Sequence, residues 1–250
     1  MISDNEHEQY SRQMMIFGEE GQEKLKKSSV TIIGSGGLGS PIAIYLAAAG
    51  VGKIKIIDHD TVELSNLNRQ IIHHHRDIGS LKTDSAKRKL NELNPEIDIE
   101  TSNETIVPDN IENVIGKTHI VVDALDNYYT RFSLNEAAVK MKVPMVHGAV
   151  EGFHGQVTTI IPEKTPCMRC IISKIPPKKT FPILGTTAGI IGTIQANEVI
   201  KYLTGTGELL NGHLLLWDGL NSNMEKIHVS KNPYCEICGS GENNYMNNEK

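Results

Sequence analysis

The chain has 250 residues, with 25 lysines and arginines against 30 aspartates and glutamates, so its formal net charge is −5. This mild acidity gives no general attraction for nucleic acid or for an anionic membrane surface, and neither is expected as a partner. The start of the chain is polar and acidic, and no apolar run approaches about 18 residues, which argues against a signal peptide and a membrane span. The composition therefore predicts a cytoplasmic α/β protein.

A glycine-rich turn follows the first segment with strand character. Residues 30–33 are apolar and β-rich, and residues 34–39 (GSGGLG) match G-x-G-x-x-G where a strand should turn into a helix. A second strand is predicted at 53–57, and the acid that ends it lies about 20 residues past the glycines, where dinucleotide folds bind ribose hydroxyls. The predicted nucleotide-binding residues are Gly34, Gly36, Gly37, Gly39 and Asp58.

Polar side chains continue directly after the second strand. A glycine loop and a helix dipole already satisfy a pyrophosphate, so a plain NAD site has no need of further donors. Two carboxamides, a guanidinium and an ammonium group would together hold three phosphates, which favours ATP over a redox cofactor. These additional candidates are Ser65, Asn66, Asn68, Arg69 and Lys82.

The other segments alternate between helix and strand patterns. Residues 10–29 predict a polar arm followed by a short helix, and residues 240–250 predict a disordered tail. Lys82 stands at the start of a predicted helix, where its charge opposes the helix dipole unless an anion lies nearby. Strands are predicted at 97–101, 118–123, 144–149 and 155–161, and helices at 83–93, 109–115 and 128–141. This order predicts a Rossmann-like, doubly wound and largely parallel α/β sheet, extended by C-terminal strands.

Asp126 and Asn127 follow the predicted strand at 118–123. In an open α/β sheet the ligand crevice lies outside the carboxyl ends of the strands, so both side chains are placed to face a nucleotide. Asp and Asn are also favourable N-caps, here for the helix predicted at 128–141. One residue can serve both purposes, and both roles stay open at this point.

Three consecutive histidines, residues 73–75, have the composition of a metal site. Neighbouring side chains point in different directions in a helix or a strand, so one ion would hardly collect all three imidazoles. A solvated or partly packed turn is the expectation for this segment.

The four cysteines form two C-x-x-C pairs. Each pair supplies two thiolates at the spacing of a tetrahedral zinc site, and four sulfur ligands make a closed, structural site. A thioredoxin-like redox site expects a single pair at a helix start, so two pairs beside Pro166 and Pro233 favour zinc. The predicted ligands are Cys167, Cys170, Cys235 and Cys238.

Four segments together resemble the MoeB/ThiF/HesA family of E1-like adenylyltransferases. They are GSGGLG at 34–39, DHDTVELSNLNRQ at 58–70, IGSLKTDSA at 78–86 and DALDN at 123–127. The resemblance implies a single adenylation domain over residues 1–239. Its parts would be an N-terminal arm and helix at 10–29, a nucleotide-binding part at 30–150 and a carrier-binding, zinc-stapled part at 151–239.

The resemblance also implies a reaction. Members of this family use ATP and Mg²⁺ to adenylate the C-terminal Gly-Gly carboxylate of a small ubiquitin-like sulfur carrier of the MoaD/ThiS type. Asp126 would hold Mg²⁺, and Arg69 and Lys82 would screen the phosphates. Arg12 would reach the ATP of the neighbouring subunit of a homodimer, as an arginine finger acts in trans.

Zinc in the four-cysteine site would leave no thiol for covalent catalysis, because a thioester relay needs an activated cysteine. In ThiF-type relatives a cysteine stands a few residues before the segment at 183–189, whereas this chain has Pro177-Lys178-Lys179-Thr180 there. A protein-bound persulfide is therefore not expected. Adenylation alone, with a separate sulfur donor and without a rhodanese domain, is the prediction.

Three other functions stay open at this stage. A nicotinamide-dependent oxidoreductase would explain the glycines and Asp58 but leave Arg69, Lys82 and Asp126 unused. A dehydratase that acts on threonylcarbamoyl-adenosine in tRNA uses similar ATP residues. An inactive E1-like scaffold would be expected to lack one of these charged residues, and all are present. The pathway, whether molybdopterin, thiamin, tRNA thiolation or protein modification, is not determined by the sequence.

Overall fold

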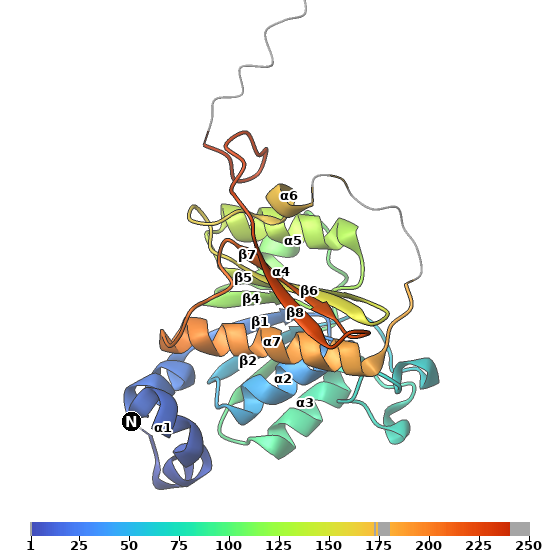
Figure 1. Ribbon diagram of the computed structural model, residues 1–250. Coiled ribbons are helices and arrows are strands. Elements are labelled where there is room, and N and C mark those ends of the chain that lie inside the picture. The colour runs from blue at the N-terminus through green and yellow to red at the C-terminus, as the bar shows by residue number, and fades with distance from the viewer. Residues whose placement is uncertain (1, 173, 175–180, 241–250) are drawn as a thin grey trace, which may run out of the picture.

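The structure is a computed structural model that describes residues 2–172, 174 and 181–240 (Figure 1). Segment 177–180 and the tail at 241–250, for which predictions were made above, lie outside the described residues. The strands are β1 Ser29–Ile33, β2 Lys53–Ile57, β3 Asp98–Ser102, β4 Ile120–Asp123, β5 Met145–Glu151, β6 His154–Ile160, β7 His213–Asp218 and β8 Asn223–His228. The helices are α1 Asp4–Lys27, α2 Gly39–Ala48, α3 Lys82–Leu93, α4 Ile111–Ile115, α5 Tyr128–Lys140, α6 Met168–Ile171 and α7 Gly185–Thr204.

All strands of the described residues belong to one sheet, in the order β3-β2-β1-β4-β5-β6-β7-β8. The strands from β3 to β5 pair in parallel, and β6, β7 and β8 continue the sheet in antiparallel register. Parallel strands are buried on both faces, which explains the continuous apolar runs of β1 and β4. The predicted doubly wound sheet with a C-terminal extension is confirmed.

Helices cover both faces of the sheet (Figure 1). On one face, α2, α3 and α7 bury one hydrophobic core against β1, β2 and β4. On the other face, α4 and α5 bury a second core that reaches Cys167 and Met168 at the start of α6. On the first face of the antiparallel strands, α7 lies against β6, and Leu215 and Trp217 of β7 pack against the core to which α7 contributes. The opposite face of these strands is the one that forms part of the cleft described below.

The order of the parallel strands changes direction between β1 and β4. The chain moves from β1 outward to β2 and β3, and then returns to β4 and continues outward to β5 on the other side. Both central strands end at the same edge, so the loops that follow them open away from each other and leave a crevice. The glycine turn after β1 and the Asp126 turn after β4 meet at this crevice.

The N-terminal prediction was wrong about the arm. Residues 4–27 form the helix α1, which begins at Ser3 with a capping box, in which Ser3 N donates to Glu6 Oε2 at 2.8 Å. The helix is kinked at Gly18, where φ is 71°. The capping residues lie upstream of the segment predicted as an arm, and Arg12 belongs to the helix, where it is exposed.

The sequence reasoning also missed α7. Its first half is rich in glycine and threonine, which lowers intrinsic helix propensity. Packing explains one of these glycines, because a Cβ at Gly192 would lie 2.6 Å from Pro41 Cγ and 2.7 Å from the Leu38 carbonyl oxygen. Gly205 ends the helix in the left-handed conformation. Among the helices of the described chain, none is both long and apolar enough to cross a lipid bilayer.

Candidate active site

A cleft of about 640 Å³ lies at the carboxyl ends of the parallel strands and continues over the antiparallel strands. Eight of the predicted nucleotide-site residues line it: Gly34, Gly36, Gly37, Asp58, Arg69, Lys82, Asp126 and Asn127. Segments from four separate parts of the chain therefore meet at one place. This is the crevice that the change in strand order creates.

The glycine turn is held close to two neighbouring strands. Gly34 has φ of 100°, and a Cβ there would lie 2.7 Å from the Ala124 carbonyl oxygen at the end of β4. Asp58 accepts hydrogen bonds from Ser35 N at 2.8 Å and Ser35 Oγ at 3.2 Å. The acid at the end of β2 thus fixes the backbone of the turn while it lines the cleft.

Two cationic side chains face the glycine turn. Arg69 donates from Nη1 to the Ser65 carbonyl at 2.9 Å and to Asn68 Oδ1 at 3.0 Å. Lys82 is nearly buried at the first position of α3, and its Nζ lies 2.8 Å from Asp60 Oδ2. An anion, the Asp60 carboxylate, thus lies beside this helix start. Burial by itself would raise the pKa of Asp60, but the hydrogen bond from Lys82, the charge of Lys82 and the charge of His59 together lower it.

Of the two roles that the sequence left open for Asp126 and Asn127, the N-cap role belongs to Asn127. Asn127 is the N-cap of α5, because its Oδ1 accepts from Thr130 N at 2.9 Å. Asp126 is exposed at the edge of the cleft, and its one hydrogen bond within the described residues is a long one, accepted by Oδ1 from Asn127 Nδ2 at 3.5 Å. The aspartate therefore keeps carboxylate oxygens available to a ligand.

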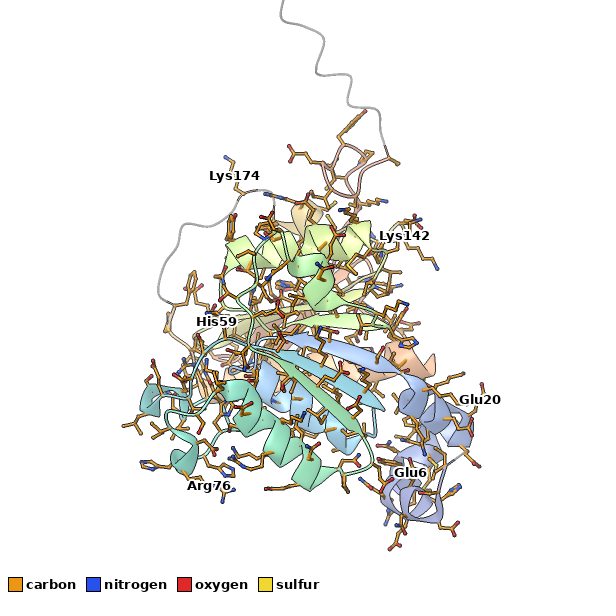
Figure 2. The ribbon with its side chains drawn as sticks, turned by 180° about the vertical axis from the view of Figure 1, so that it is seen from behind. Glu6, Glu20, His59, Arg76, Lys142 and Lys174 are labelled. Atoms are coloured by element: carbon orange, nitrogen blue, oxygen red, sulfur yellow. The ribbon has the colours of Figure 1, made fainter. Side chains whose placement is uncertain are left out.

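Five predicted residues do not line the cleft: Arg12, Gly39, Ser65, Asn66 and Asn68. Asn66 is buried and caps the 3₁₀ turn at Leu64–Asn66, since its Oδ1 accepts from Glu63 N at 3.0 Å. Arg12 belongs to α1, which lies at the opposite end of the sheet from the cleft residue His59. Figure 2 shows this separation through its labels on Glu6 and Glu20 of α1 and on His59.

A buried polar cluster behind the cleft was missed by the sequence reasoning. Asp123 and His147 are at most 1% exposed, and Arg131 is 4% exposed. His147 Nδ1 lies 2.6 Å from Asp123 Oδ2, and Arg131 Nε lies 3.6 Å from the same oxygen. Burial would raise the pKa of Asp123, but the Arg131 charge and the His147 hydrogen bond outweigh it and lower that pKa. The only sequence signal was an acidic residue at the end of a buried strand.

The three histidines do not share one site. His73 is 4% exposed, with Nδ1 at 2.9 Å from Ser85 Oγ of α3 and Nε2 at 3.2 Å from the Ser35 carbonyl. His74 and His75 are exposed. His73 therefore joins the glycine turn to the helix that begins with Lys82. Burial, aided by the charges of Lys89 and Lys82, lowers the pKa of His73 from 6.5 to about 4.

We expect His73 to make stability depend on pH between these two values. From about pH 6.5 down to about pH 4 the unfolded chain binds a proton that the folded chain refuses, so stability falls as the pH decreases. The stability advantage of the wild-type protein over His73→Gln should be largest near pH 7 and shrink through this range. Urea unfolding of both proteins at several pH values measures this difference in the free energy of unfolding. The exposed residue His75, changed to Gln, is the control, and parallel curves for wild type and His73→Gln would refute the expectation.

The wall of the cleft beyond the nucleotide end is a face of the antiparallel strands that no helix of the described residues covers. Two cross-strand rows on this face line the cleft: Ala149, Gln156, Leu216 and Glu225, followed by Glu151, His154, Asp218 and Asn223. Alternate residues of a strand share a face, which accounts for the two rows. The glycine turn and this sheet surface therefore line one and the same cleft.

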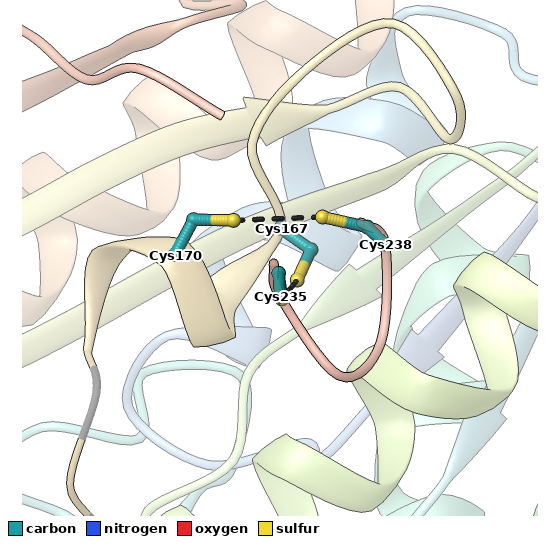
Figure 3. A group of neighbouring side chains, drawn as sticks. All are labelled: Cys167, Cys170, Cys235 and Cys238. Atoms are coloured by element: carbon teal, nitrogen blue, oxygen red, sulfur yellow. Dashed lines mark hydrogen bonds between the residues drawn. The ribbon is translucent and has the colours of Figure 1, made fainter. Parts of the chain in front are cut away.

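The four cysteines converge although the pairs are 68 residues apart (Figure 3). Cys167 Sγ lies 3.7 Å from Cys235 Sγ, and Cys170 Sγ lies 3.5 Å from Cys238 Sγ. All four sulfurs lie within 4.8 Å of one another. Zinc–sulfur bonds of about 2.3 Å in a tetrahedron place sulfurs about 3.8 Å apart, so the donor set and its spacing fit zinc. The site ties α6 to the segment that follows β8.

The fold and the cleft define a nucleotide-binding α/β protein of the Rossmann class with an antiparallel extension. Solved structures of Escherichia coli MccB share this fold. The MccB complex with N-formylated MccA superposes with a TM-score of 0.86 at 23% identity, over 94% of this chain and 76% of that one.

The chain belongs to the ThiF family, whose model matches residues 10–237. It is 40% identical over 242 residues to the SAMP-activating enzyme E1 of Haloferax volcanii, covering 94% of this chain and 89% of that protein. It is also 40% identical over 247 residues to the sulfur carrier protein adenylyltransferase of Thermus thermophilus, covering 94% and 91%. The resemblance on which the sequence analysis relied is confirmed.

Proposed function

We propose that this protein uses ATP to adenylate the C-terminal Gly-Gly carboxylate of a small ubiquitin-like sulfur carrier, releasing pyrophosphate. The observation that carries the proposal is one continuous cleft, in which Arg69, Lys82 and Asp126 lie at the end with the glycine turn and a bare sheet face forms the other end. The ThiF match and the two adenylating relatives support this choice.

The reaction needs little from the protein beyond placement and charge. A carboxylate oxygen of the carrier attacks the α-phosphorus of ATP, and the bond from that phosphorus to the β-phosphate oxygen breaks. No general base is required, because a C-terminal carboxyl group is ionised at neutral pH. Arg69 and Lys82 would screen the negative charges of the carboxylate and the phosphates as these approach each other. The orientation of the two reactants in the cleft would supply the rest of the rate enhancement.

Asp126 would hold Mg²⁺ on the phosphates, a role that fits an exposed carboxylate at the cleft edge. The ion, when bound, supplies further charge neutralisation at the transferring phosphate. Asp58 would bind the ribose, and the glycine turn would receive the phosphates. The ammonium group of Lys82 would bind a phosphate oxygen, either in place of the Asp60 carboxylate or together with it. A slender glycine tail would enter the cleft beside the sheet face, where larger side chains would clash.

Pyrophosphate exchange tests this proposal. Adenylation is reversible while the acyl-adenylate stays bound, so labelled pyrophosphate should enter ATP only when carrier and Mg²⁺ are both present. A carrier that lacks its last glycine should support no exchange. Exchange that needs no carrier, or that needs tRNA in place of a carrier, would reject the proposal.

No thioester between enzyme and carrier should form at any time. The four cysteines of the chain would all be committed to one structural zinc ion. Sulfur must then come from a separate donor, after adenylation. Thiolates that hold zinc persist in a reducing compartment, which supports a cytoplasmic location.

A homodimer with shared sites is the proposed active form. Arg12 is exposed on α1 and does not line the cleft of its own chain, and the proposal is that it serves the ATP of a neighbouring subunit. We expect Arg12→Ala and Asp126→Ala each to be inactive, and a mixture with exchanged subunits to regain activity. Random pairing leaves about a quarter of all sites intact in such a mixture. Absence of recovery, after subunit exchange has been demonstrated by mass spectrometry, would exclude the shared site.

A further inference from the structure

Two backbone groups of Leu125 are held by buried side chains. Leu125 N donates to Asp123 Oδ1 at 3.0 Å, and Arg131 Nη2 donates to the Leu125 carbonyl oxygen. Leu125 immediately precedes Asp126, and Asn127 on the other side is fixed as the N-cap of α5. The backbone on both sides of Asp126 is therefore fixed, although the Asp126 side chain is exposed.

His147 completes this arrangement from β5. Its Nδ1 lies 2.6 Å from Asp123 Oδ2, and because an ionised carboxylate only accepts, Nδ1 carries the proton. His147 Nε2 is then an acceptor for the amide of Gln156, 3.1 Å away, a residue of the cleft wall. Burial lowers the pKa of His147, so this neutral form holds at pH 7.

A buried ion pair of this kind is a weak source of stability. Removing Asp123 and Arg131 from water costs several kcal/mol per ion, and well-packed apolar residues often stabilise a core as much or more. What the pair supplies is geometry, because its hydrogen bonds are directed at the two backbone groups of Leu125. A turn that bears a metal ligand benefits from such support, since partners behind a ligand fix its orientation.

We propose that Asp123, Arg131 and His147 are positioning residues that fix the turn at 124–127 and hold Asp126 in the orientation in which it binds Mg²⁺. The proposal rests on the proposed function for the role of Asp126. Arg131 also lines the cleft, but the proposed role of the cluster is exerted through the backbone of Leu125.

The test compares His147→Leu, which removes the bond to Asp123, with His147→Asn, which keeps an N–H donor near the Nδ1 position. His147→Leu should raise the Mg²⁺ concentration that half-saturates exchange about 10-fold and lower kcat about 10-fold, the scale seen for partners behind metal ligands. KM for the carrier should change less than about 2-fold, and His147→Asn should recover most of the loss.

Hydrogen exchange supplies a readout that needs neither metal nor activity. The amide of Leu125, followed in a peptide that spans 121–130, should exchange at least about 10-fold faster in His147→Leu than in the wild-type protein. The control is Glu198→Gln, which alters a different buried carboxylate. Glu198 accepts from Thr159 Oγ1 and Leu210 N and does not touch the turn. It should change stability but neither Leu125 exchange nor the Mg²⁺ requirement.

Arg131→Lys keeps a positive charge beside Asp123 but removes the directed bond to the Leu125 carbonyl, so it extends the test if His147→Leu does not fold. It should shift the Mg²⁺ requirement in the same direction. Wild-type values of both readouts in folded His147→Leu or Arg131→Lys would overturn the inference. A wild-type protein without carrier-dependent exchange would reject the proposed function, and amide exchange at Leu125 would still decide whether the cluster fixes the turn.

Discussion

Replacing Asp126 by alanine is expected to lower carrier-dependent pyrophosphate exchange by about 100-fold or more. Losing one preorganised electrostatic contributor typically costs this much. Asp126 is exposed, and its side chain makes no buried contact with the described residues, so the variant should fold as well as the wild-type protein. Exchange rates at saturating carrier, measured over a range of Mg²⁺ concentrations, give the effect.

Glu136→Ala is the matched control for this experiment, because Glu136 is an exposed carboxylate on α5, the helix that begins beside Asp126. It should leave exchange unchanged. Asp126→Asn keeps the size of the side chain and removes the charge, so it should resemble the alanine variant. Near-normal exchange in both Asp126 variants would remove this residue from the proposed chemistry.

Replacing Cys235 by serine is expected to lower the melting temperature by roughly 10 °C, since losing a cross-link that closes a long loop costs about 3 to 5 kcal/mol. Serine fills the same space but is a poor zinc ligand. The wild-type protein should contain about one zinc ion per chain, as a closed tetrahedral site requires. Differential scanning calorimetry and metal analysis measure the two quantities.

Glu236→Ala changes an exposed residue between the two cysteines of the same pair and should affect neither metal content nor melting. A protein without zinc, or with a disulfide within either pair, would contradict the assignment. A carrier-linked adduct that survives denaturation and is released by thiols would contradict it as well, because a cysteine would then be free for catalysis.

The nucleotide half of the molecule was largely predictable from the sequence. The strand predicted at 53–57 has those bounds in the structure, and β1 begins one residue before the prediction. Lys82 begins α3 as expected. These features depend on neighbours in sequence, such as a glycine turn between a strand and a helix, and local chemistry determines them.

The polar cluster behind the cleft could not be predicted in the same way. Asp123 and His147 are 24 residues apart, and only the register of β4 against β5 brings them together. His73 similarly gains its role from contacts with Ser35 and Ser85, which belong to different elements. The helix α7 was missed because glycines lower its propensity, and one of them, Gly192, serves close packing on Pro41 of α2, a tertiary cause that propensity does not reveal.

The distance along the chain between the two cysteine pairs has a consequence for the order of folding. Cys235 follows Cys167 by 68 residues, and α7, β7 and β8 lie between them. A growing chain that has reached only α6 holds two thiolates, too few for tight zinc binding. The nucleotide half can fold during synthesis, before the second pair leaves the ribosome. Zinc uptake at this site would then be a late event, and it would stabilise only chains that have already added the last strands to the sheet.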